Sequence, residues 1–237
     1  MFMGKKILAV VPARSGSKGV PDKNMRVLAG KTLIGRAGEC LKQVQWIDKR
    51  IISTDSPIYA REGEKYGLEA PFLRPKELSI DTASALDTMT HALLEAEKIY
   101  KETFDIILII QPTSPLRASE DIENSIRLLV NLKADSVVTV NKLSLDSHPK
   151  KILTIKNNRL NFFNKAGKFV TSRQSLDDSY YWRNGVCYAL TRNCLIKKKQ
   201  IITNNTVPLV IEREGVSIDE PIDLEWAEFL LNREKRL

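Results

Sequence analysis

The sequence DIILIIQ, at Asp105–Gln111, places five consecutive apolar residues between two polar ends. A short run that is apolar at every position is typical of a strand buried on both faces of a parallel sheet. We therefore predict a central parallel strand here. The polar residues that follow it should lie at the carboxyl edge of the sheet, where such sheets bind their ligands.

Segments on both sides of this strand alternate between strand and helix patterns. Further strands are predicted at Ile7–Val11, Arg50–Thr54, Ala70–Leu73, Ser136–Val140, Val186–Leu190 and Thr206–Ile211. Helices are predicted at Leu33–Val44, Ile58–Tyr66 and Ile222–Arg233, with one capped by Asp81 or Thr82 and another beginning at Ser119–Asp121. This alternation predicts an α/β fold, a parallel sheet with helices on both faces.

The alternation stops after Val140. From Asn141 to Tyr181 the sequence is polar, with short β-like runs (KILTI, RLNFF and KFVTS) separated by turn signals at Asn157–Asn158 and Ala166–Gly167. We interpret residues 141–181 as an insert whose expected task is subunit contact. The chain otherwise reads as a single domain over residues 1–237.

Composition narrows the class of protein. The 237 residues are 43% hydrophobic, which argues against wholesale disorder. No run approaches the roughly 20 apolar residues of a membrane span, and Met1–Lys6 lacks the apolar segment of a signal peptide. Three widely spaced cysteines without a CxxC motif fit neither a disulfide framework nor a zinc ribbon. We expect a cytoplasmic protein that makes no contact with a membrane.

The net charge of +8 comes from 37 Lys and Arg against 29 Asp and Glu. Such a balance suits nucleic acid, but it equally suits an enzyme that binds phosphates or acidic metabolites. The densest basic run, Lys197–Lys199, contains no aromatic residue to stack on bases, and we interpret it as a solvated helix end. Nucleic acid is therefore not expected as a partner.

The loop Pro12–Asn24, with sequence PARSGSKGVPDKN, directly follows the first predicted strand. Gly16 and Gly19 let the backbone approach a ligand and turn its N–H groups outward. The cations of the same loop are Arg14, Lys18 and Lys23. The loop is neither a GxxxxGK[ST] nor a GxGxxG motif. We predict a cradle for a polyphosphate, with an ordinary basic surface loop as the alternative.

Two further polar segments are candidates for the same site. Gln111–Arg117 (QPTSPLR) ends the central strand, and the Gln111 amide both donates and accepts, which suits a hydroxyl or a carboxylate. Ser217–Asp223 (SIDEPID) leads into the last helix. Asp219 precedes that helix and could offer an oxygen ligand to Mg²⁺. Asp223 is either a helix cap or a second ligand.

Taken in chain order, these motifs resemble those of the acylneuraminate cytidylyltransferases, the CMP-sialic acid synthetases. The matching stretches run from Lys6 to Leu231: the A-R-x-x-S-K-G-x-x-x-K-N loop, Arg74–Pro75, Asp81–Ser84, Q-P-T-S-P-L-R, Arg183–Gly185 and the I-D…D-L ending. The resemblance implies a three-layer α/β/α, Rossmann-like nucleotidyltransferase fold with a mostly parallel sheet. It also implies a homodimer in which residues 141–181 form the dimerisation element.

The resemblance further implies a reaction. CTP and a nine-carbon 2-keto sugar acid give a CMP-sugar and pyrophosphate with Mg²⁺ as cofactor, for cell-surface glycan synthesis. Catalysis is implied for Arg14, Lys23 and Asp219, and metal binding for Asp219 and Asp223. Nucleotide binding is implied for Arg14, Ser17, Lys18, Gly19, Lys23, Asn24, Arg74, Ser84 and Asn184. Binding of the sugar acid is implied for Gln111, Lys151, Arg173 and Tyr188.

The chain also departs from the family pattern. Sialic acid members carry Asp-Ile-Asp where this chain has Ser217–Ile218–Asp219, so a hydroxyl replaces one expected metal carboxylate. The sugar acid is left open between sialic, legionaminic and pseudaminic acids. Two other functions stay open as alternatives: a CMP-Kdo synthetase, and a nucleotide- or RNA-binding regulator without turnover.

Overall fold

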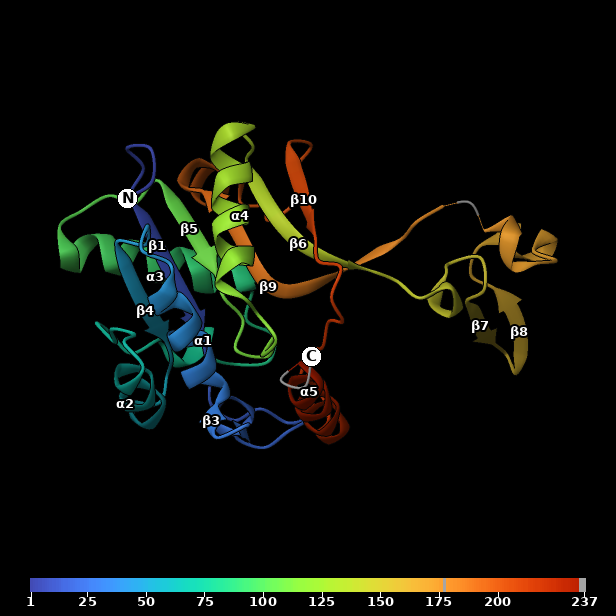
Figure 1. The fold of residues 1–237 in the computed structure, drawn as a ribbon, viewed down its shortest axis with the longest axis horizontal. Coiled ribbons are helices and arrows are strands. Elements are labelled where there is room, and N and C mark those ends of the chain that lie inside the picture. Colours follow the sequence, from blue (N-terminus) through green and yellow to red (C-terminus); the bar gives the residue numbers. More distant parts are fainter. Residues whose placement is uncertain (177, 235–237) are drawn as a thin grey trace.

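Six strands form the central sheet of the computed structural model, which describes residues 1–176 and 178–234, in the order β10-β6-β9-β5-β1-β4 (Figure 1). Their bounds are Ile7–Pro12 (β1), Lys49–Ser53 (β4), Ile106–Ile109 (β5), Ser136–Lys142 (β6), Tyr181–Thr191 (β9) and Thr206–Val210 (β10). β1 runs parallel to β4 and β5, and β6 runs parallel to β10. β9 runs antiparallel to both of its neighbours, β5 and β6. The predicted mostly parallel sheet is confirmed, but the DIILIIQ strand has a parallel neighbour on one side only.

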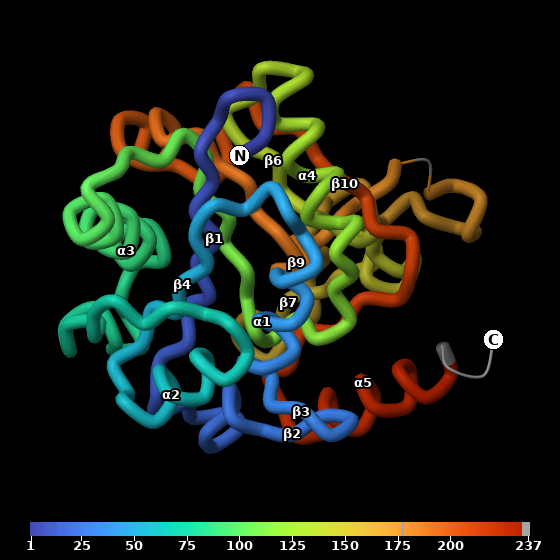
Figure 2. Tube along the Cα trace, turned by 60° about the vertical axis from the view of Figure 1, so that its left-hand side comes forward, coloured from blue at the N-terminus to red at the C-terminus, as the bar shows by residue number. Residues whose placement is uncertain are grey.

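Helices cover both faces of this sheet, as predicted (Figures 1 and 2). One face packs on α1 (Leu33–Gln43), α2 (Pro57–Lys65) and α4 (Ser119–Asn131), and the other on α3 (Ala85–Tyr100) and the short helix η6 (Cys194–Lys198). Alternation along β1 assigns side chains to the two faces: Ile7, Ala9 and Val11 join the first core cluster, and Leu8 and Val10 join the second.

Short polar side chains fix where the helices begin. Thr32 Oγ1 accepts a hydrogen bond from Gly35 N (2.9 Å) at the start of α1, and Ser84 Oγ accepts from Leu86 N (3.2 Å) at the start of α3. The predicted cap of α3 at Asp81 or Thr82 is therefore wrong by two to three residues. The Asp81 carboxylate instead pairs with cations of the loop after β1.

The predicted strand at Ala70–Leu73 is also wrong. Residues 70–73 form no strand or bridge, and the isolated bridge between Ile51 and Glu69 lies just before them. The backbone then turns away and rejoins the sheet edge where Arg74 N donates to Thr54 O (2.7 Å). Four apolar or small residues fit a short edge strand by composition, but Pro71 removes one backbone donor from it.

A small separate core supports the loop after β1. Val20 and Leu28 pack with Leu33, Ile218 and Ala227, which joins this loop to α5 (Pro221–Glu234) and to the hairpin of β2 (Val27–Leu28) and β3 (Lys31–Thr32). Figure 2 shows α5 alongside this hairpin. The packing brings the segment before α5 against the loop, although about 200 residues separate them in the sequence.

Residues 143–176 and 178–180 project from the sheet between β6 and β9 (Figure 1). This segment contains the hairpin of β7 (Leu153–Lys156) and β8 (Arg159–Phe162) and short 3-10 helices at Leu145–Ser147, Lys165–Phe169 and Arg173–Ser175. Asn157 and Asn158 form the hairpin turn with φ of 49° and 61°, a conformation that asparagine tolerates. The β-like reading of KFVTS is wrong, since Lys165–Phe169 is a 3-10 helix.

The three cysteines lie inside the protein. Cys40, Cys187 and Cys194 are free thiols buried in the protein. Burial raises the pKa of Cys187 to about 12, so this thiol stays protonated at neutral pH. Across residues 1–176 and 178–234, no helix combines the length and the apolar character needed to cross a bilayer.

Candidate active site

A cleft of about 460 Å³ opens at the carboxyl edge of the sheet, where β1, β4 and β5 end. Its walls come from the loop after β1, from residues 74–89, from the end of β5 and from the segment before α5. Nine of the predicted site residues line it: Arg14, Ser17, Lys18, Gly19, Lys23, Asn24, Arg74, Gln111 and Asp219. The topology thus brings the three candidate segments together.

Hydrogen bonds within the loop after β1 fix its shape. Ser17 Oγ donates to Val20 O (2.6 Å) and accepts from Lys23 N (3.0 Å). Asn24 is buried, and its Nδ2 donates to Arg14 O (3.1 Å). These contacts hold the backbone on either side of the cations, so hydrogen bonds within the protein define the conformation of the loop.

Each cation of the loop faces a carboxylate. Arg14 Nη2 binds Asp81 Oδ1, and Lys18 Nζ lies 2.7 Å from Asp81 Oδ2. Lys23 Nζ donates to Asp219 Oδ1 (2.8 Å) and to Ile218 O (2.7 Å). Hydrogen bonds from Lys18 and Arg14 lower the pKa of Asp81, and the one from Lys23 lowers that of Asp219. Both carboxylates are therefore ionised at neutral pH.

Arg74 supplies a buried donor at the cleft wall. It is 6% exposed, and its Nη2 donates to Ser53 O (2.5 Å). Burial lowers the pKa of Arg74 to about 10, which still leaves the guanidinium charged at neutral pH. Within the described chain its Nε is buried with no hydrogen-bond partner. Sequence reasoning missed the apolar wall beside it, formed by Leu78, Ile80, Ala83, Ala85, Met89 and Ile109.

Asp55, just after β4, holds the loop after β1 through two hydrogen bonds from Ser15. One carboxylate oxygen accepts from Ser15 N (2.8 Å) and the other from Ser15 Oγ (2.6 Å). Burial raises the pKa of Asp55, but hydrogen bonds to the carboxylate, led by the two from Ser15, together with the charge of Arg74 outweigh burial, and the net pKa lies below the ordinary value. Asp55 therefore stabilises the folded loop above the ordinary aspartate pKa, and this stabilisation is lost as pH falls through the lowered value.

Asp55→Asn is expected to lose about 1 kcal/mol of folding free energy at pH 7, because an amide accepts more weakly than a carboxylate. Urea unfolding measured from pH 7 down to pH 3 tests this. The difference between wild type and variant should begin to shrink as the pH falls below about 4, where Asp55 of the unfolded wild type starts to be protonated, and should continue to shrink toward the lowered pKa of the folded state. A difference that is constant over this range would show that the charge of Asp55 plays no part.

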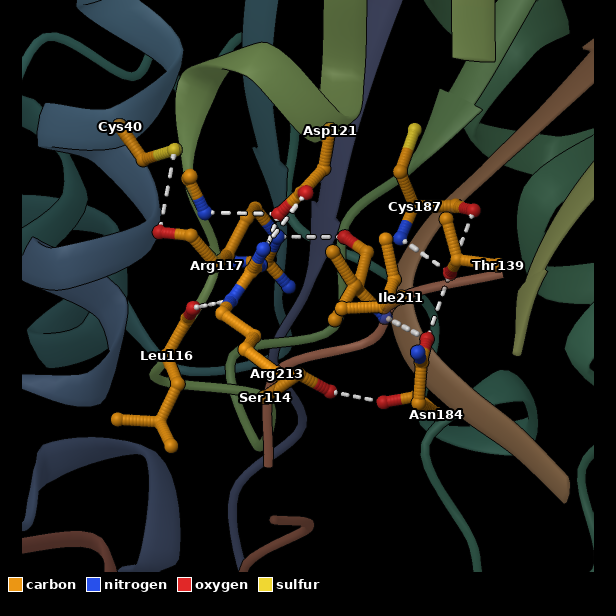
Figure 3. Close-up of polar contacts among 12 residues, drawn as sticks. Cys40, Ser114, Leu116, Arg117, Asp121, Thr139, Asn184, Cys187, Ile211 and Arg213 are labelled. Atoms are coloured by element: carbon orange, nitrogen blue, oxygen red, sulfur yellow. Dashed lines mark hydrogen bonds and ion pairs between the residues drawn. The ribbon is translucent and has the colours of Figure 1, made fainter. Parts of the chain in front are cut away.

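A buried polar network holds the QPTSPLR segment in place (Figure 3). Arg117 donates to Gln111 O (2.6 Å), to Gly185 O (3.3 Å) and to Val186 O. Ser114 Oγ donates to Asn184 O (2.6 Å). Gly185 has φ of 69°, and a Cβ there would lie 2.3 Å from Gln111 Oε1. Only glycine at this turn leaves room for the Gln111 side chain.

Two predicted site residues belong to this network rather than to the cleft wall. Asn184 is 2% exposed, and its Oδ1 accepts from Thr139 Oγ1 (2.6 Å) (Figure 3). Its Nδ2 donates to Asn141 Oδ1 (2.8 Å). Tyr188 is buried in β9, and its hydroxyl accepts from Gly185 N (3.2 Å). Both side chains support the turn at Gly185, which in turn positions Gln111.

The remaining predicted residues lie outside the cleft of this chain. Ser84 caps α3, although Ala83 and Ala85 on either side of it line the cleft. Lys151, paired with Asp146, and Arg173 belong to the projecting segment (Figure 1).

Asp223 supplies the cap that its position predicts. Its Oδ2 accepts from Asp219 N (2.8 Å) and from Glu220 N (2.7 Å). Glu220 directly precedes α5, so the second contact is the backward half of a capping box, and Pro221 occupies the first helical position. These contacts give the backbone N–H groups just before α5 a hydrogen-bond acceptor, and they fix the backbone that carries Asp219.

The donor set suits a magnesium ion shared with a ligand. The described residues include no cluster of three or more His, Cys, Asp or Glu that could hold a metal by itself. Asp219 lines the cleft, and its Oδ2 accepts from Ser217 Oγ (3.0 Å). Mg²⁺ is commonly held by one or two carboxylates together with substrate phosphates and waters. Asp219, one of the two carboxylates in the cleft lining, offers one such oxygen ligand.

Gly19 lies where the loop touches the segment before α5. A Cβ at Gly19 would lie 2.5 Å from Asp219 O, so Gly19→Ala must push the two segments apart. If the cleft is catalytic, we expect turnover to fall about 10- to 100-fold, because a displacement near 1 Å costs that much.

Gly16→Ala is the control: its Cβ meets no atom, but φ is 66°, so it should lose about 1 kcal/mol of stability with less effect on turnover. Equal turnover in both variants would contradict the close-contact argument.

A family model described as Cytidylyltransferase matches residues 8–206, which span the loop after β1, the apolar wall and the QPTSPLR segment. The chain belongs to the cytidylyltransferase family. The cleft therefore has the location of a nucleotide site at the carboxyl edge of the sheet.

Relatives within the cytidylyltransferase family carry related names. The chain is 33% identical to a CMP-N,N'-diacetyllegionaminic acid synthase from Legionella pneumophila, with 94% of each chain covered. It is 31% identical to an N-acylneuraminate cytidylyltransferase from Escherichia coli, with 99% of this chain but 54% of that protein covered. A solved CMP:2-keto-3-deoxy-manno-octonic acid synthetase, complexed with CTP, has a TM-score of 0.72 at 19% identity. It covers 97% of this chain and 99% of that one, and shows that the fold is shared.

Proposed function

We propose that this cytidylyltransferase activates a nine-carbon 2-keto sugar acid with CTP, giving a CMP-sugar and pyrophosphate. The observation that carries the proposal is the cleft itself. Three loop cations, a buried arginine and the Gln111 amide face one space at the carboxyl edge of the sheet. The names of the Legionella and Escherichia coli relatives support a nonulosonic acid as the acceptor.

In this reaction the anomeric hydroxyl of the sugar acid attacks the α-phosphorus of CTP. A new P–O bond forms to the sugar, the bond to the bridging oxygen of the β-phosphate breaks, pyrophosphate leaves with the electron pair, and the proton of the attacking hydroxyl is released to solvent. Little covalent chemistry is required of the protein, so catalysis is positioning and charge neutralisation. Arg14 and Lys23 would neutralise the charge that develops on the leaving pyrophosphate.

Two features of the cleft support a cytidine nucleotide. The unpartnered Nε of Arg74 offers a buried donor to a carbonyl oxygen of the base. The apolar wall offers a surface for its ring. Mg²⁺, held by Asp219 and the phosphates, would add positive charge to the triphosphate site.

We also propose that the protein acts as a homodimer through residues 141–181. Large apolar side chains of the projecting segment are exposed, among them Ile155 (73%), Leu160 (68%), Phe163 (65%) and Phe169 (80%). Apolar surface of this kind is typical of an interface between subunits. A partner's segment would bring Lys151 and Arg173 to the sugar end of the cleft, which they do not reach within one chain.

Mixing two inactive variants tests that arrangement. Arg14→Ala damages the nucleotide cleft, and Arg173→Ala damages the sugar contact offered by the partner. In a mixed dimer one site receives both substitutions and the other receives neither, so we expect activity to return to about a quarter of the wild-type level after random exchange. Activity that stays at the level of the separate variants would show that Arg173 acts within its own chain or not at all.

Pyrophosphate release tests the function as a whole. The protein is incubated with CTP, Mg²⁺ and one of sialic, legionaminic, pseudaminic or Kdo acid, and the CMP-sugar is identified by mass. We expect release with a nonulosonic acid and slower release with Kdo, whose synthetase shares the fold. Release with Kdo alone would support a CMP-Kdo synthetase, and CTP binding without release from any acid would support a regulator.

A further inference from the structure

Asp81 is the acidic residue that closes the cleft opposite the cation loop. It lies between the 3-10 helix Lys76–Leu78 and α3, on the wall opposite the loop after β1. Each of its carboxylate oxygens binds a different cation of that loop, Oδ1 to Arg14 and Oδ2 to Lys18. A single carboxylate thus bridges the two walls.

This bridge occupies the cations that a polyphosphate needs. A carboxylate and a phosphate present similar oxygen acceptors to a guanidinium or an ammonium group. A triphosphate that binds Arg14 and Lys18 must therefore displace Asp81 and then lies beside its negative charge. The contacts are reversible, since the side chains of Arg14, Lys18 and Asp81 are 32%, 85% and 40% exposed. Ion pairs this exposed contribute little to folding.

Resting on the proposed function, we propose that Asp81 is an internal stand-in for a phosphate group. It holds Arg14 and Lys18 in place in the free protein, and it makes the cleft select ligands with enough negative charge to displace it. A polyphosphate meets that condition, whereas the single carboxylate of a sugar acid does not. After the reaction Asp81 rebinds the two cations and favours the release of pyrophosphate.

The test is anion binding by Asp81→Asn, which keeps the shape of the side chain and removes its charge. Calorimetric titration with tripolyphosphate, CTP and neutral cytidine needs no turnover and no sugar acid. We expect tripolyphosphate and CTP to bind roughly fivefold to thirtyfold more tightly than to the wild type, equivalent to two exposed ion pairs that no longer have to be broken. Cytidine affinity should not change. The gain should shrink as NaCl rises from about 0.05 M to about 1 M.

Glu77→Gln is the matched control, because Glu77 lies exposed on the same segment and outside the cleft lining. It makes the same charge change and is expected to leave tripolyphosphate affinity within about twofold, since screening weakens distant exposed charges. Asp81→Ala serves as a second variant and should also bind tripolyphosphate more tightly if charge is the cause. A thermal melt of each variant confirms folding.

The outcomes separate this proposal from the proposed function. Unchanged or weaker tripolyphosphate binding by folded Asp81→Asn would overturn the role of Asp81, whatever the enzyme's activity. An equal gain for Glu77→Gln would also overturn it, by showing a general charge effect. Tighter tripolyphosphate binding by Asp81→Asn supports the proposal even if no sugar acid reacts, a result that would count against the proposed function alone.

Discussion

Arg14→Ala is expected to lower turnover about 10²- to 10³-fold at saturating CTP, the usual loss when one preorganised contact to developing charge is removed. Arg14 lines the cleft and presents a planar fork of donors, which matches two phosphate oxygens at once. Folding should change by less than about 1 kcal/mol, because its ion pair with Asp81 is exposed. Pyrophosphate release and urea unfolding measure the two effects separately.

Two further substitutions show whether the fork or the charge of Arg14 matters. Arg14→Lys keeps the charge without the planar fork of donors, and we expect turnover to fall about tenfold. Lys18→Ala removes a cation whose side chain is 85% exposed, and turnover of this variant should fall by no more than about tenfold. Near-normal turnover of Arg14→Ala at saturating CTP would reject the role of Arg14.

Much of the fold follows from local sequence patterns. The apolar runs at β1, β4, β5, β6 and β10 were all predicted as strands. Burial on both faces explains the continuous apolar residues of β1 and β5, whereas β10 is a partly exposed edge strand. The direction of β9 was not predictable in this way. Val186–Leu190 is apolar whichever way it runs, and its antiparallel pairing with β5 and β6 depends on how the projecting segment returns to the sheet.

The cleft was predictable where function depends on a contiguous motif. The loop after β1 and Gln111 come directly after two neighbouring parallel strands, so chain order alone brings them to one edge. Asp219 required long-range packing: Ile218 N donates to Thr113 O (2.8 Å), and the small core on α5 holds this segment against the loop.

The roles of two residues, Asn184 and Asp81, were predicted wrongly for a different reason. Asn184 is polar and precedes a glycine, which is typical of an exposed turn, yet it is buried on β9, where it hydrogen-bonds Thr139 and Asn141 of the neighbouring strand β6. Asp81 is a residue type that often caps helices, yet its carboxylate forms ion pairs with Arg14 and Lys18 on the opposite wall of the cleft. In both residues a long-range partner decides the role, and single-sequence reasoning cannot supply that partner.

Asp219→Ala is expected to abolish most activity, about 10²-fold or more, and to raise the Mg²⁺ concentration needed for half-maximal turnover. A triphosphate carries about four negative charges near neutral pH, and Arg14 and Lys23 cannot balance them alone. Asp219 is the carboxylate of the segment before α5 that lines the cleft. Its substitution also removes the ion-pair partner of Lys23 Nζ, which donates to Asp219 Oδ1 (2.8 Å) and keeps its hydrogen bond to Ile218 O. Mn²⁺ binding in the presence of CTP, followed by its EPR signal, gives a readout that does not depend on turnover.

Two variants of neighbouring residues sharpen the assignment of Asp219. Ser217 Oγ lies 3.0 Å from Asp219 Oδ2, so Ser217→Asp would place a second carboxylate beside the first and should lower the Mg²⁺ requirement. Asp223→Asn weakens the cap of α5 and should cost about 1 kcal/mol of stability while leaving the Mg²⁺ dependence unchanged. If Asp219→Ala keeps its activity and its Mg²⁺ dependence while Asp223→Asn shifts that dependence, the carboxylate that holds the metal is Asp223, and the cap contact must open when CTP binds.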